Sequence, residues 1–465
     1  MQTRRDFIKN VGLALPVFSL TQFLLSSCNP KEKDTGSDRK KIGIIGAGIS
    51  GLHAALLLHS YNQYDIEVLE AGDQIGGRIQ SSEYAFNTCN IELGASTIYG
   101  NNSWYDIVRY NLPKSIPINS ASSYIIDSEI KSSNELNKES DYAFMLQKFN
   151  SMASFVPTAD MTIEQYINLS SVPERVRFIF EEKTEGLIGT SVDRASVSAN
   201  KSEGIGKITQ EQYTSNTDSF SKVLLKHYAP ILPMVSNNVP VAEIDYTGAK
   251  IKVTDAHHGV RFFDKLIITV PLSILKLKSN QANHIRFTPE LPESKYEAME
   301  HLGMDAGVKI FLKLNARFWH KDAKTIYSNG KYGKFEVVHE NLVTNTFVLS
   351  ATFFGKFAEE HLNLKSEAEI LEDIKSEWKN TIGLSAANSI VNHQVEFWSK
   401  NPYIQGAFSY HKVGSGMQFR EELSRQVNDK LFFAGEATNY DKKSGTVNGA
   451  IDTSVRVVEE LRHFL

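Results

Sequence analysis

The chain has 465 residues, of which 41% are hydrophobic and 22% charged, and its formal net charge is −4. This length exceeds what one hydrophobic core usually organises and fits two or three domains. Because neither sign of charge is in excess, the composition gives no support for a nucleic-acid partner. The 13 histidines and 2 cysteines show no metal-ligand spacing, so we expect no metal site.

Residues 1–28 are typical of an export signal and not of a folded domain. Arg4 and Arg5 precede an apolar run of about 15 residues, which is shorter than the roughly 20 residues that span a bilayer. The run closes with LSSC at Cys28, and the whole segment resembles a twin-arginine signal with a lipoprotein cleavage box. We therefore expect a lipid on Cys28, a polar linker over residues 29–40, and an exported protein tethered to a membrane. An uncleaved amphipathic N-terminus is the alternative.

The stretch that begins at Lys41 has the pattern of a dinucleotide-binding βαβ unit. KIGII predicts a strand, GAGISG a turn, LHAALLLHS a helix, and YDIEVLE a second strand that ends at Glu70. Gly46 permits the tight turn, Gly48 lets backbone N–H groups approach a pyrophosphate, and Gly51 lets the helix pack on the strand. The helix N-terminus favours the anion, and Glu70 can accept hydrogen bonds from ribose hydroxyls.

The residues that follow Glu70 favour FAD over NAD. In Gly76-Gly77-Arg78 the glycines let the backbone come close to the ligand, and the guanidinium can bind phosphate. With this motif the chain resembles the flavin-containing amine oxidases, a family of monoamine and polyamine oxidases and flavin-dependent histone lysine demethylases. The resemblance covers most of residues 41–462 and continues through IELGASTIYG, KLIITVPLSILK and LFFAGEATNYDKKSGTVNGA.

The resemblance implies an α/β fold with a discontinuous, Rossmann-like FAD-binding domain and an inserted α+β substrate domain. The FAD-binding segments are expected at residues 41–105, 228–285 and 400–462, and the substrate-domain segments at residues 106–227 and 286–399. The residues implied in FAD binding are Gly46, Gly48, Ser50, Gly51, Glu70, Gly77, Arg78, Gly94, Ala95, Ser96, Val241, Gly435, Glu436, Thr446 and Val447. Capping boxes are expected at Thr162 and Ser171, so the first insertion should be largely helical.

Three further residues are implied at the reacting face. GVKIFLKLNARFWH predicts a strand with Lys309, Phe311 and Lys313 on one face, and by this pattern alone Lys309 is a solvated lysine. The resemblance implies instead that Lys309 holds a water at the flavin N5 position. It also implies that Trp398 packs near the flavin and that Phe408, together with Phe311, encloses the amine. Two core aromatics of an unrelated sheet are the alternative for Trp398 and Phe408.

Departures from the family pattern narrow the expected chemistry. Ala407 stands where monoamine oxidases place a flavin-bonded cysteine, so we expect non-covalent FAD. Thr446 stands where monoamine oxidases place the second tyrosine of the aromatic cage around the amine. The segment from Ser96 to Tyr99 offers no cation for an amino-acid carboxylate, and we expect nothing near Tyr99 to supply an acid for a polyamine. We expect oxidation of a small amine at its C–N bond, with oxygen or another acceptor. The alternatives are a flavin desaturase or dehydrogenase acting on a non-amine substrate, and a binding protein that kept the fold without the cofactor.

Overall fold

The computed structural model describes residues 39–100, 102–112, 115–117, 121–203, 212–215 and 218–465. The predicted signal and nearly all of the linker, with Arg4, Arg5 and Cys28, lie outside these residues. Within the described part of the chain, no helix combines the length and the apolar character needed to cross a bilayer.

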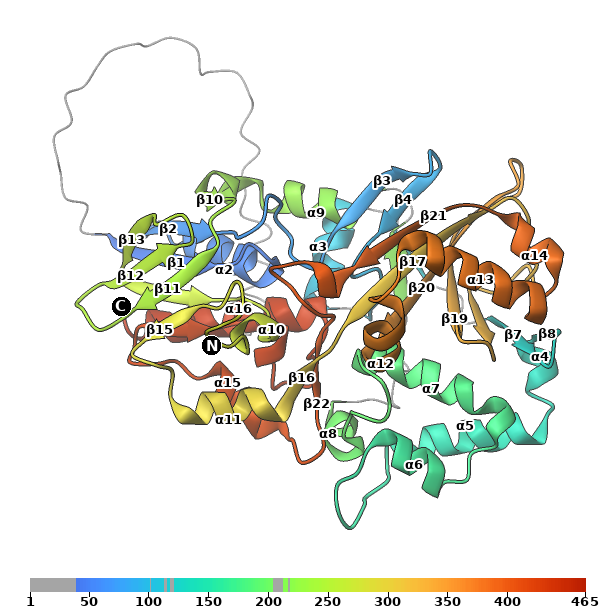
Figure 1. Cartoon of the computed structure of the whole chain (residues 1–465). Coiled ribbons are helices and arrows are strands. Elements are labelled where there is room, and N and C mark those ends of the chain that lie inside the picture. Colours follow the sequence, from blue (N-terminus) through green and yellow to red (C-terminus); the bar gives the residue numbers. More distant parts are fainter. Residues whose placement is uncertain (1–38, 101, 113–114, 118–120, 204–211, 216–217) are drawn as a thin grey trace, which may run out of the picture.

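A parallel sheet forms the centre of the half of the molecule drawn on the left of Figure 1. Its strands, in spatial order, are β10 (Val235–Ser236), β2 (Tyr64–Leu69), β1 (Lys40–Ile45), β14 (Lys265–Ile268) and β23 (Leu431–Phe433). Helices α2 (Ile49–Ser60) and α16 (Val447–Arg462) pack against each other and share one hydrophobic core with the sheet. Because three segments far apart in sequence meet in this sheet, the predicted Rossmann-like α/β fold is confirmed. We call this half the cofactor domain.

A second sheet extends the cofactor domain. Its strands, in spatial order, are β13 (Val260–Phe263), β12 (Ile251–Asp255), β11 (Val241–Asp245) and β15 (Arg286–Thr288). Helix α11 (Glu293–His301) then packs against α15 (Met417–Ser424). Since β15 pairs with β11, this half of the molecule continues beyond residue 285, where the sequence suggested a boundary.

A seven-stranded sheet dominates the other half, which we call the substrate domain (Figure 1). In spatial order it comprises β21 (Ile390–Phe397), β17 (Gly307–Leu314), β20 (Thr346–Phe354), β19 (Lys334–Asn341), β18 (Thr325–Ser328), β7 (Ser122–Ile126) and β8 (Glu129–Ser132). Helices α13 (Glu367–Thr381) and α14 (Leu384–Ser389) pack against β21. The first insertion is helical, as expected, with α4 (Ser133–Leu136), α5 (Ser140–Met152), α6 (Ile163–Leu169), α7 (Glu174–Ile188) and α8 (Val197–Ser202).

The remaining elements are short. The strands among them are β3 (Ser81–Ala85), β4 (Cys89–Glu92), β5 (Ile98–Tyr99), β6 (Ser115–Pro117), β9 (Gln212–Ser215), β16 (Leu302–Met304) and β22 (Ser409–His411). The helices and helical turns are α3 (Ser103–Asn111), α9 (Phe220–His227), η1 (Ala229–Met234), α10 (Leu272–Leu275), α12 (Gly355–Phe357), η2 (Ala358–Leu362), η3 (Trp398–Lys400) and η4 (Glu436–Thr438).

The two predicted capping boxes have different outcomes. Thr162 caps α6 in a reciprocal arrangement with Gln165, as predicted. The expectation at Ser171 is wrong, because α7 starts at Glu174 directly after Pro173 and has no side-chain cap. Ser171 lies too far upstream and adopts a left-handed conformation, with φ of 52°.

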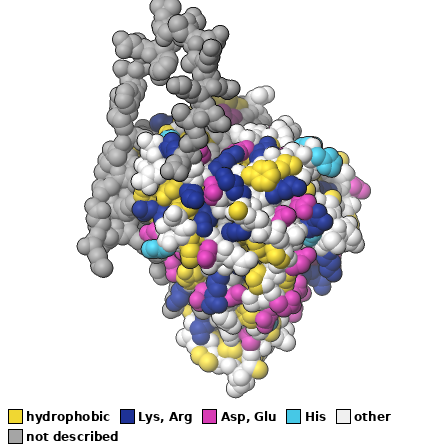
Figure 2. All heavy atoms as spheres, turned by 90° about the vertical axis from the view of Figure 1, so that its left-hand side faces the viewer, with side chains coloured by type: hydrophobic (Ala, Val, Ile, Leu, Met, Phe, Trp, Pro, Cys, Tyr) yellow, Lys and Arg dark blue, Asp and Glu magenta, His cyan; other side chains and the backbone are white. Residues whose placement is uncertain are grey.

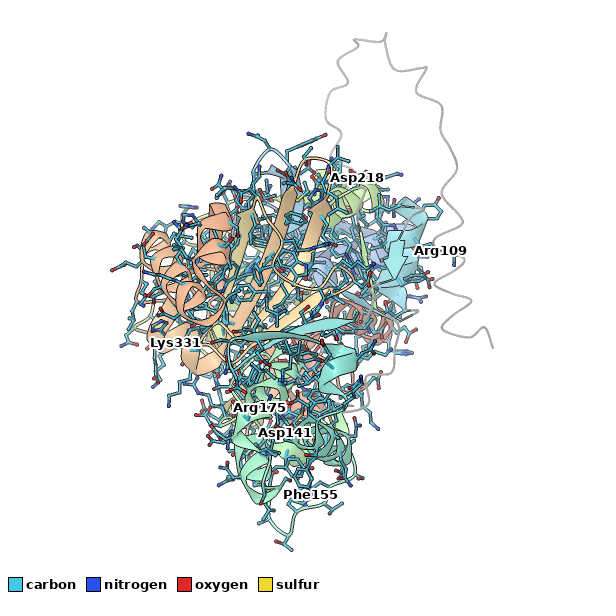
Figure 3. All side chains as sticks on the ribbon, turned by 90° about the vertical axis from the view of Figure 1, so that its right-hand side faces the viewer. Arg109, Asp141, Phe155, Arg175, Asp218 and Lys331 are labelled. Atoms are coloured by element: carbon cyan, nitrogen blue, oxygen red, sulfur yellow. The ribbon has the colours of Figure 1, made fainter. Side chains whose placement is uncertain are left out.

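Charged side chains on the surface are mixed in sign. On the face of the cofactor domain seen in Figure 2, basic and acidic side chains are interspersed. In the substrate domain, Arg175 on α7 contacts Asp141 on α5 at 2.8 Å and Glu139 at 2.6 Å, and Figure 3 shows Arg175 and Asp141 side by side. Such partly exposed pairs connect neighbouring helices but contribute little to stability.

Candidate active site

A cavity of about 1530 Å³ lies between the two domains. Its lining includes the glycine loop after β1, the end of β2, and the segment from Gly94 to Gly100. From the substrate domain, α7, β17, β19 and β20 contribute to the wall. Every residue predicted for the FAD site and the reacting face lines this cavity except Gly51, which lies behind the loop, and Phe311.

The glycine loop has the geometry that a phosphate cradle needs. Gly46 has φ of +101°, a conformation that other residues rarely adopt. A Cβ on Gly51 would lie 2.0 Å from the Gly46 carbonyl oxygen, which explains why Gly51 is needed although it does not face the cavity. Gly48 precedes α2, carries no side-chain cap, and has no atom within 4 Å of the position a Cβ would take. The N-terminus of α2 is therefore open toward the cavity and suited to an anion.

Glu70 at the end of β2 holds the loop in place. Its Oε2 accepts from the Ala47 N–H at 2.7 Å and its Oε1 from the Gly72 N–H at 2.9 Å. Burial raises the pKa of the carboxyl, although the backbone donors oppose this effect. Each carboxylate oxygen keeps a further lone pair, so the geometry leaves room for the predicted contact with ribose hydroxyls.

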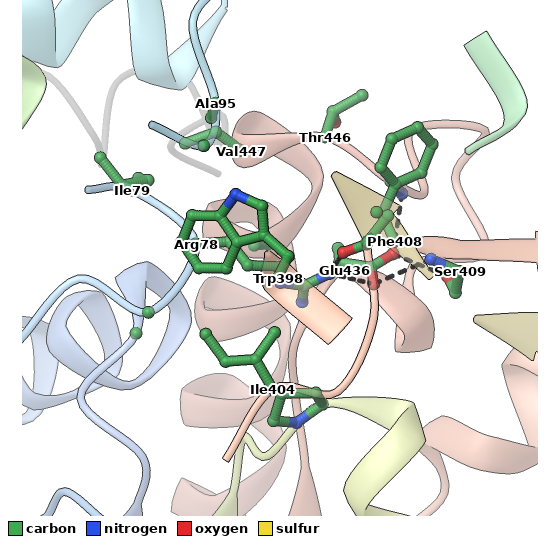
Figure 4. A pocket seen from close by; sticks show the side chains of 18 of the residues that line it. Arg78, Ile79, Ala95, Trp398, Ile404, Phe408, Ser409, Glu436, Thr446 and Val447 are labelled. Carbon is green, nitrogen blue, oxygen red and sulfur yellow. Dashed lines mark hydrogen bonds and ion pairs between the residues drawn. The ribbon is translucent and has the colours of Figure 1, made fainter. Parts of the chain in front are cut away.

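Arg78, which is partly exposed, and the buried Glu436 form an ion pair in the cavity wall (Figure 4). Arg78 Nη1 donates to Glu436 Oε1 at 3.0 Å and to the Ala407 carbonyl at 2.8 Å. Glu436 also accepts from the Ser409 hydroxyl at 2.6 Å and from the Gly445 N–H at 2.9 Å. Burial would raise the pKa of Glu436, but the positive charges of Arg78 and a second arginine outweigh burial and lower it. The carboxylate is thus ionised and engaged with protein groups.

Lys309 and Trp398 converge on one short segment after β4. Lys309 Nζ donates to the carbonyl oxygens of Glu92 at 2.8 Å and Gly94 at 3.0 Å. Trp398 Nε1 donates to the carbonyl oxygen of Leu93, between those two, at 2.9 Å. Lys309 is only 4% exposed, and burial lowers its pKa to about 8. Its third hydrogen is available to a water molecule or ligand in the cavity.

Phe408 is held between glycines from both domains. A Cβ on Gly189, just after α7, or on Gly445, before α16, would lie 2.6 Å from the Phe408 ring. The ring also meets Phe354 edge-on, with centroids 5.4 Å apart. Sequence patterns gave no signal for Gly189 or Phe354, because their relevance arises only from the contact between domains.

The structure corrects the role expected for Phe311. Lys309, Phe311 and Lys313 do share one face of β17, but only Lys309 lines the cavity. Phe311 is fully buried in a small core with Ala85 and Ile91 of the β3–β4 hairpin. That hairpin covers the strand beyond Lys309, and Lys313 Nζ donates to the Phe86 carbonyl at 3.0 Å.

The structure also corrects the expectation that no acid lies near Tyr99. Burial and the negative charge of Glu336 raise the pKa of the Tyr99 hydroxyl. Glu336, on β19, pairs with Lys334 at 2.8 Å. These charges were missed because β19 is far from Tyr99 in sequence and carries no motif.

Three carboxylates of α7 line the same cavity, and one of them, Glu181, pairs with Arg177 at 2.7 Å. Glu182 and Glu185 both line it, and neither has an ion-pair partner within 4.0 Å among the described residues. Burial raises the pKa of Glu182 to about 7 and that of Glu185 well above its ordinary value. By the rise of an α-helix, their backbone positions lie about 10 Å and 6 Å along the helix axis before Gly189, which packs against the Phe408 ring.

Comparison with protein families agrees with this geometry. Residues 44–110 match the family of NAD(P)-binding Rossmann-like domains, and residues 235–462 match the family of flavin containing amine oxidoreductases. Residues 235–462 are thus similar to the flavin containing amine oxidoreductases. A flavin cofactor and an oxidoreductase activity are properties of this family.

Individual relatives cover nearly the whole chain. Polyamine oxidase 5 of Oryza sativa subsp. japonica is 26% identical over 91% of this chain and 87% of its own length. Human lysine-specific histone demethylase 2 is 26% identical over 91% of this chain, which spans only 54% of the demethylase. Two solved structures, cyclohexylamine oxidase from Brevibacterium oxydans IH-35A and putrescine oxidase bound to putrescine, share the fold. The cyclohexylamine oxidase covers 91% of this chain and is matched over 100% of its own length, with 17% identity and a TM-score of 0.73. The putrescine oxidase covers 91% of this chain and is matched over 99% of its own length, with 16% identity and a TM-score of 0.74.

Proposed function

We propose that this protein is an FAD-dependent oxidoreductase that oxidises an amine at the carbon next to nitrogen. The observation that carries the proposal is the position of Lys309, buried at the junction of the cofactor and substrate parts of one cavity and held beside Trp398. A lysine shielded from solvent in this way, with one free hydrogen, is typical of a functional group and not of a solvated strand residue.

The residues of the cavity fit a bound FAD. Gly48 leaves an open surface at the N-terminus of α2 for a pyrophosphate, and Glu70 is placed for a ribose. Thr446 caps the N-terminus of α16, where the helix favours negative charge on a ligand. Ala407 provides no nucleophile beside the site, which supports non-covalent binding.

Flavin supplies an acceptor for a hydride from the substrate carbon. The protein's own contribution is to bind the amine, orient its carbon and exclude water. Phe408 and Trp398 are apolar walls that disfavour a charged amine and so support the neutral form that can give up a hydride. Lys309 holds a water molecule through its third hydrogen. Hydrolysis of the resulting imine by water would release a carbonyl product and an amine, and oxygen or another acceptor would take up the two electrons left on the cofactor.

We infer that the substrate carries a second positive group. Glu182 and Glu185 are partly buried carboxylates with no ion-pair partner within 4.0 Å among the described residues, and a bound cation would offset the cost of shielding them from water. Both residues line the cavity and lie two turns (Glu182) and one turn (Glu185) before Gly189, which packs against Phe408, so we expect a cation attached to the reacting amine by a short chain to reach them. The names of the polyamine and putrescine oxidases among the similar proteins support the same substrate class.

An anaerobic stopped-flow screen tests the proposed activity. Monoamines, diamines, polyamines, amino acids and cyclic alkenes would each be mixed with the purified protein while flavin absorbance is followed. Bleaching by amines supports the proposal, and bleaching by non-amines alone would favour a desaturase or dehydrogenase. A colourless protein that cannot be reconstituted with FAD would leave only the binding-protein alternative. Flavin that remains with the acid-precipitated protein would contradict non-covalent binding.

We further propose that the protein is exported and tethered to a membrane through a lipid on Cys28. The support is the order of the twin arginines, the apolar run and the LSSC box. Lysine at both Arg4 and Arg5 should leave the protein in the cytoplasm, and Cys28→Ser should abolish lipid labelling. Unchanged fractionation and labelling in these variants would contradict the proposal.

A further inference from the structure

Arg420 on α15 is a fully buried arginine that no predicted motif includes. Its Nη1 donates to the Ser409 hydroxyl at 2.7 Å and to the Ala437 carbonyl at 3.1 Å. Its Nε donates to Glu203 Oε1 at 2.6 Å. A guanidinium is always charged, so its burial requires this set of acceptors.

Arg420 is connected to both sides of Phe408. The Ser409 hydroxyl accepts from Arg420 and donates to Glu436 Oε2 at 2.6 Å, while the Ser409 N–H donates to Glu436 Oε1 at 3.2 Å. On the other side of Phe408, the Ala407 carbonyl accepts from Arg78, the partner of Glu436. Figure 4 shows the contacts of Glu436 with Arg78 and Ser409 near Phe408. The backbone that carries the cage aromatic is therefore fixed at both of its peptide neighbours.

Glu203 brings the substrate domain into the same network. It follows α8, its side chain is only 9% exposed, and its Oε1 lies 2.6 Å from Nε2 of the buried His411. Burial would raise the pKa of Glu203, but the charge of Arg420 and the contact with His411 outweigh burial and lower it. Glu203 is thus an anion, and the pair with Arg420 joins α8 of one domain to α15 of the other.

We infer that the Glu203–Arg420 ion pair positions Phe408, because it fixes Ser409 and Glu436 relative to the substrate domain. A buried ion pair gains little stability over apolar residues of the same size, because desolvation offsets attraction. What it provides here is a fixed relation between α8, α15 and the loop that carries the cage aromatic. Glu203 and Arg420 are positioning residues, and the kinetic part of their role rests on the proposed function.

Fluorine NMR tests the positioning directly and does not depend on activity. 4-Fluorophenylalanine would be placed at position 408. The fluorine spectra of the variants Glu203→Gln and Ser409→Ala would then be compared with the spectrum of the labelled protein without these substitutions. Both variants should broaden or split the single resonance, since each breaks one step between Arg420 and the loop. Arg425→Gln is the matched control, because Arg425 directly follows α15 but is 63% exposed and pairs with Glu421 and Glu422 of that helix. A sharp, unmoved resonance in both variants would overturn the inference, and Ser409→Ala decides alone if Glu203→Gln does not fold.

A double-mutant cycle on kcat/KM gives the second readout. Glu203→Gln should lower kcat/KM for the best amine roughly 10-fold, the loss expected when one positioning interaction is removed. In a Phe408→Ala background the same change should have almost no effect, because the group that it positions is gone. Equal effects in both backgrounds would show that Glu203 acts elsewhere. If no amine is a substrate, the proposed function fails while the NMR result still decides the positioning role.

Discussion

Lys309 and Trp398 share one short stretch of backbone: Lys309 Nζ binds the carbonyl oxygens of Glu92 and Gly94, and Trp398 Nε1 binds that of Leu93 between them. The two side chains come from β17 and η3, yet their polar ends are fixed within three residues of each other along the segment after β4. Any ligand that touches one of them is therefore held at a defined place relative to the other.

Replacing Lys309 should separate catalysis from binding. Lys309→Met should keep the fold and the flavin, but slow flavin reduction or reoxidation by about 100-fold, the scale of losing a positioned catalytic group. Stopped-flow measurement of both half-reactions checks this. Lys313→Met is the control and should change neither rate, because Lys313 reaches only the Phe86 carbonyl outside the cavity. The reverse pattern, with Lys313 essential and Lys309 dispensable, would refute the assignment.

Filling the space at Gly189 should displace the cage aromatic. Gly189→Ala would put a Cβ 2.6 Å from the Phe408 ring and add strain at φ of +72°. Gly414→Ala is the matched control, since Gly414 has φ of +78° but no atom within 4 Å of the new Cβ. Thermal unfolding should show a comparable loss of about 1 kcal/mol from strain in both variants. Only Gly189→Ala should also raise KM for amines, and equal KM values in the two variants would contradict the assigned cage.

The two unpaired carboxylates of α7 should discriminate between substrates. Glu182→Gln and Glu185→Gln should lower kcat/KM for diamines by roughly 10-fold or more, because each variant loses a charge-assisted contact, and leave monoamines little changed. A series of diamines with an increasing number of methylenes would locate each carboxylate along the chain. Glu181→Gln is the control, because Glu181 already pairs with Arg177 at 2.7 Å. Equal losses for monoamines and diamines would argue against a site for a second cation.

The raised pKa of Glu182 predicts the direction in which the stability of the protein changes with pH. The folded protein holds a proton on Glu182 up to about pH 7, whereas the unfolded chain releases it near 4.5. The folded state therefore binds more protons between these values, and this contribution to stability is present at low pH and lost as the pH rises through 7. Denaturant unfolding of the wild type and Glu182→Gln should show the stability difference change between pH 4.5 and 7. A difference that is constant over this range would mean that Glu182 is not perturbed.

The sequence by itself determined the parts of the site that are local in the chain. The turn at Gly46, the packing at Gly51 and the acid at Glu70 lie within one βαβ unit, so their spacing alone specified the cradle. The identity of Lys309 was also predicted, although only by resemblance, because its pattern on β17 is that of an ordinary strand lysine.

Only the tertiary structure decided which residues surround the reacting face. It buried Phe311 under the β3–β4 hairpin, brought Glu182 and Glu336 into the cavity, and set Gly189 against Phe408. These contacts join segments that are far apart in the chain and carry no periodic or motif signal. Their physical basis is the packing of two domains against each other, which places buried charges and close backbone approaches where no local pattern requires them.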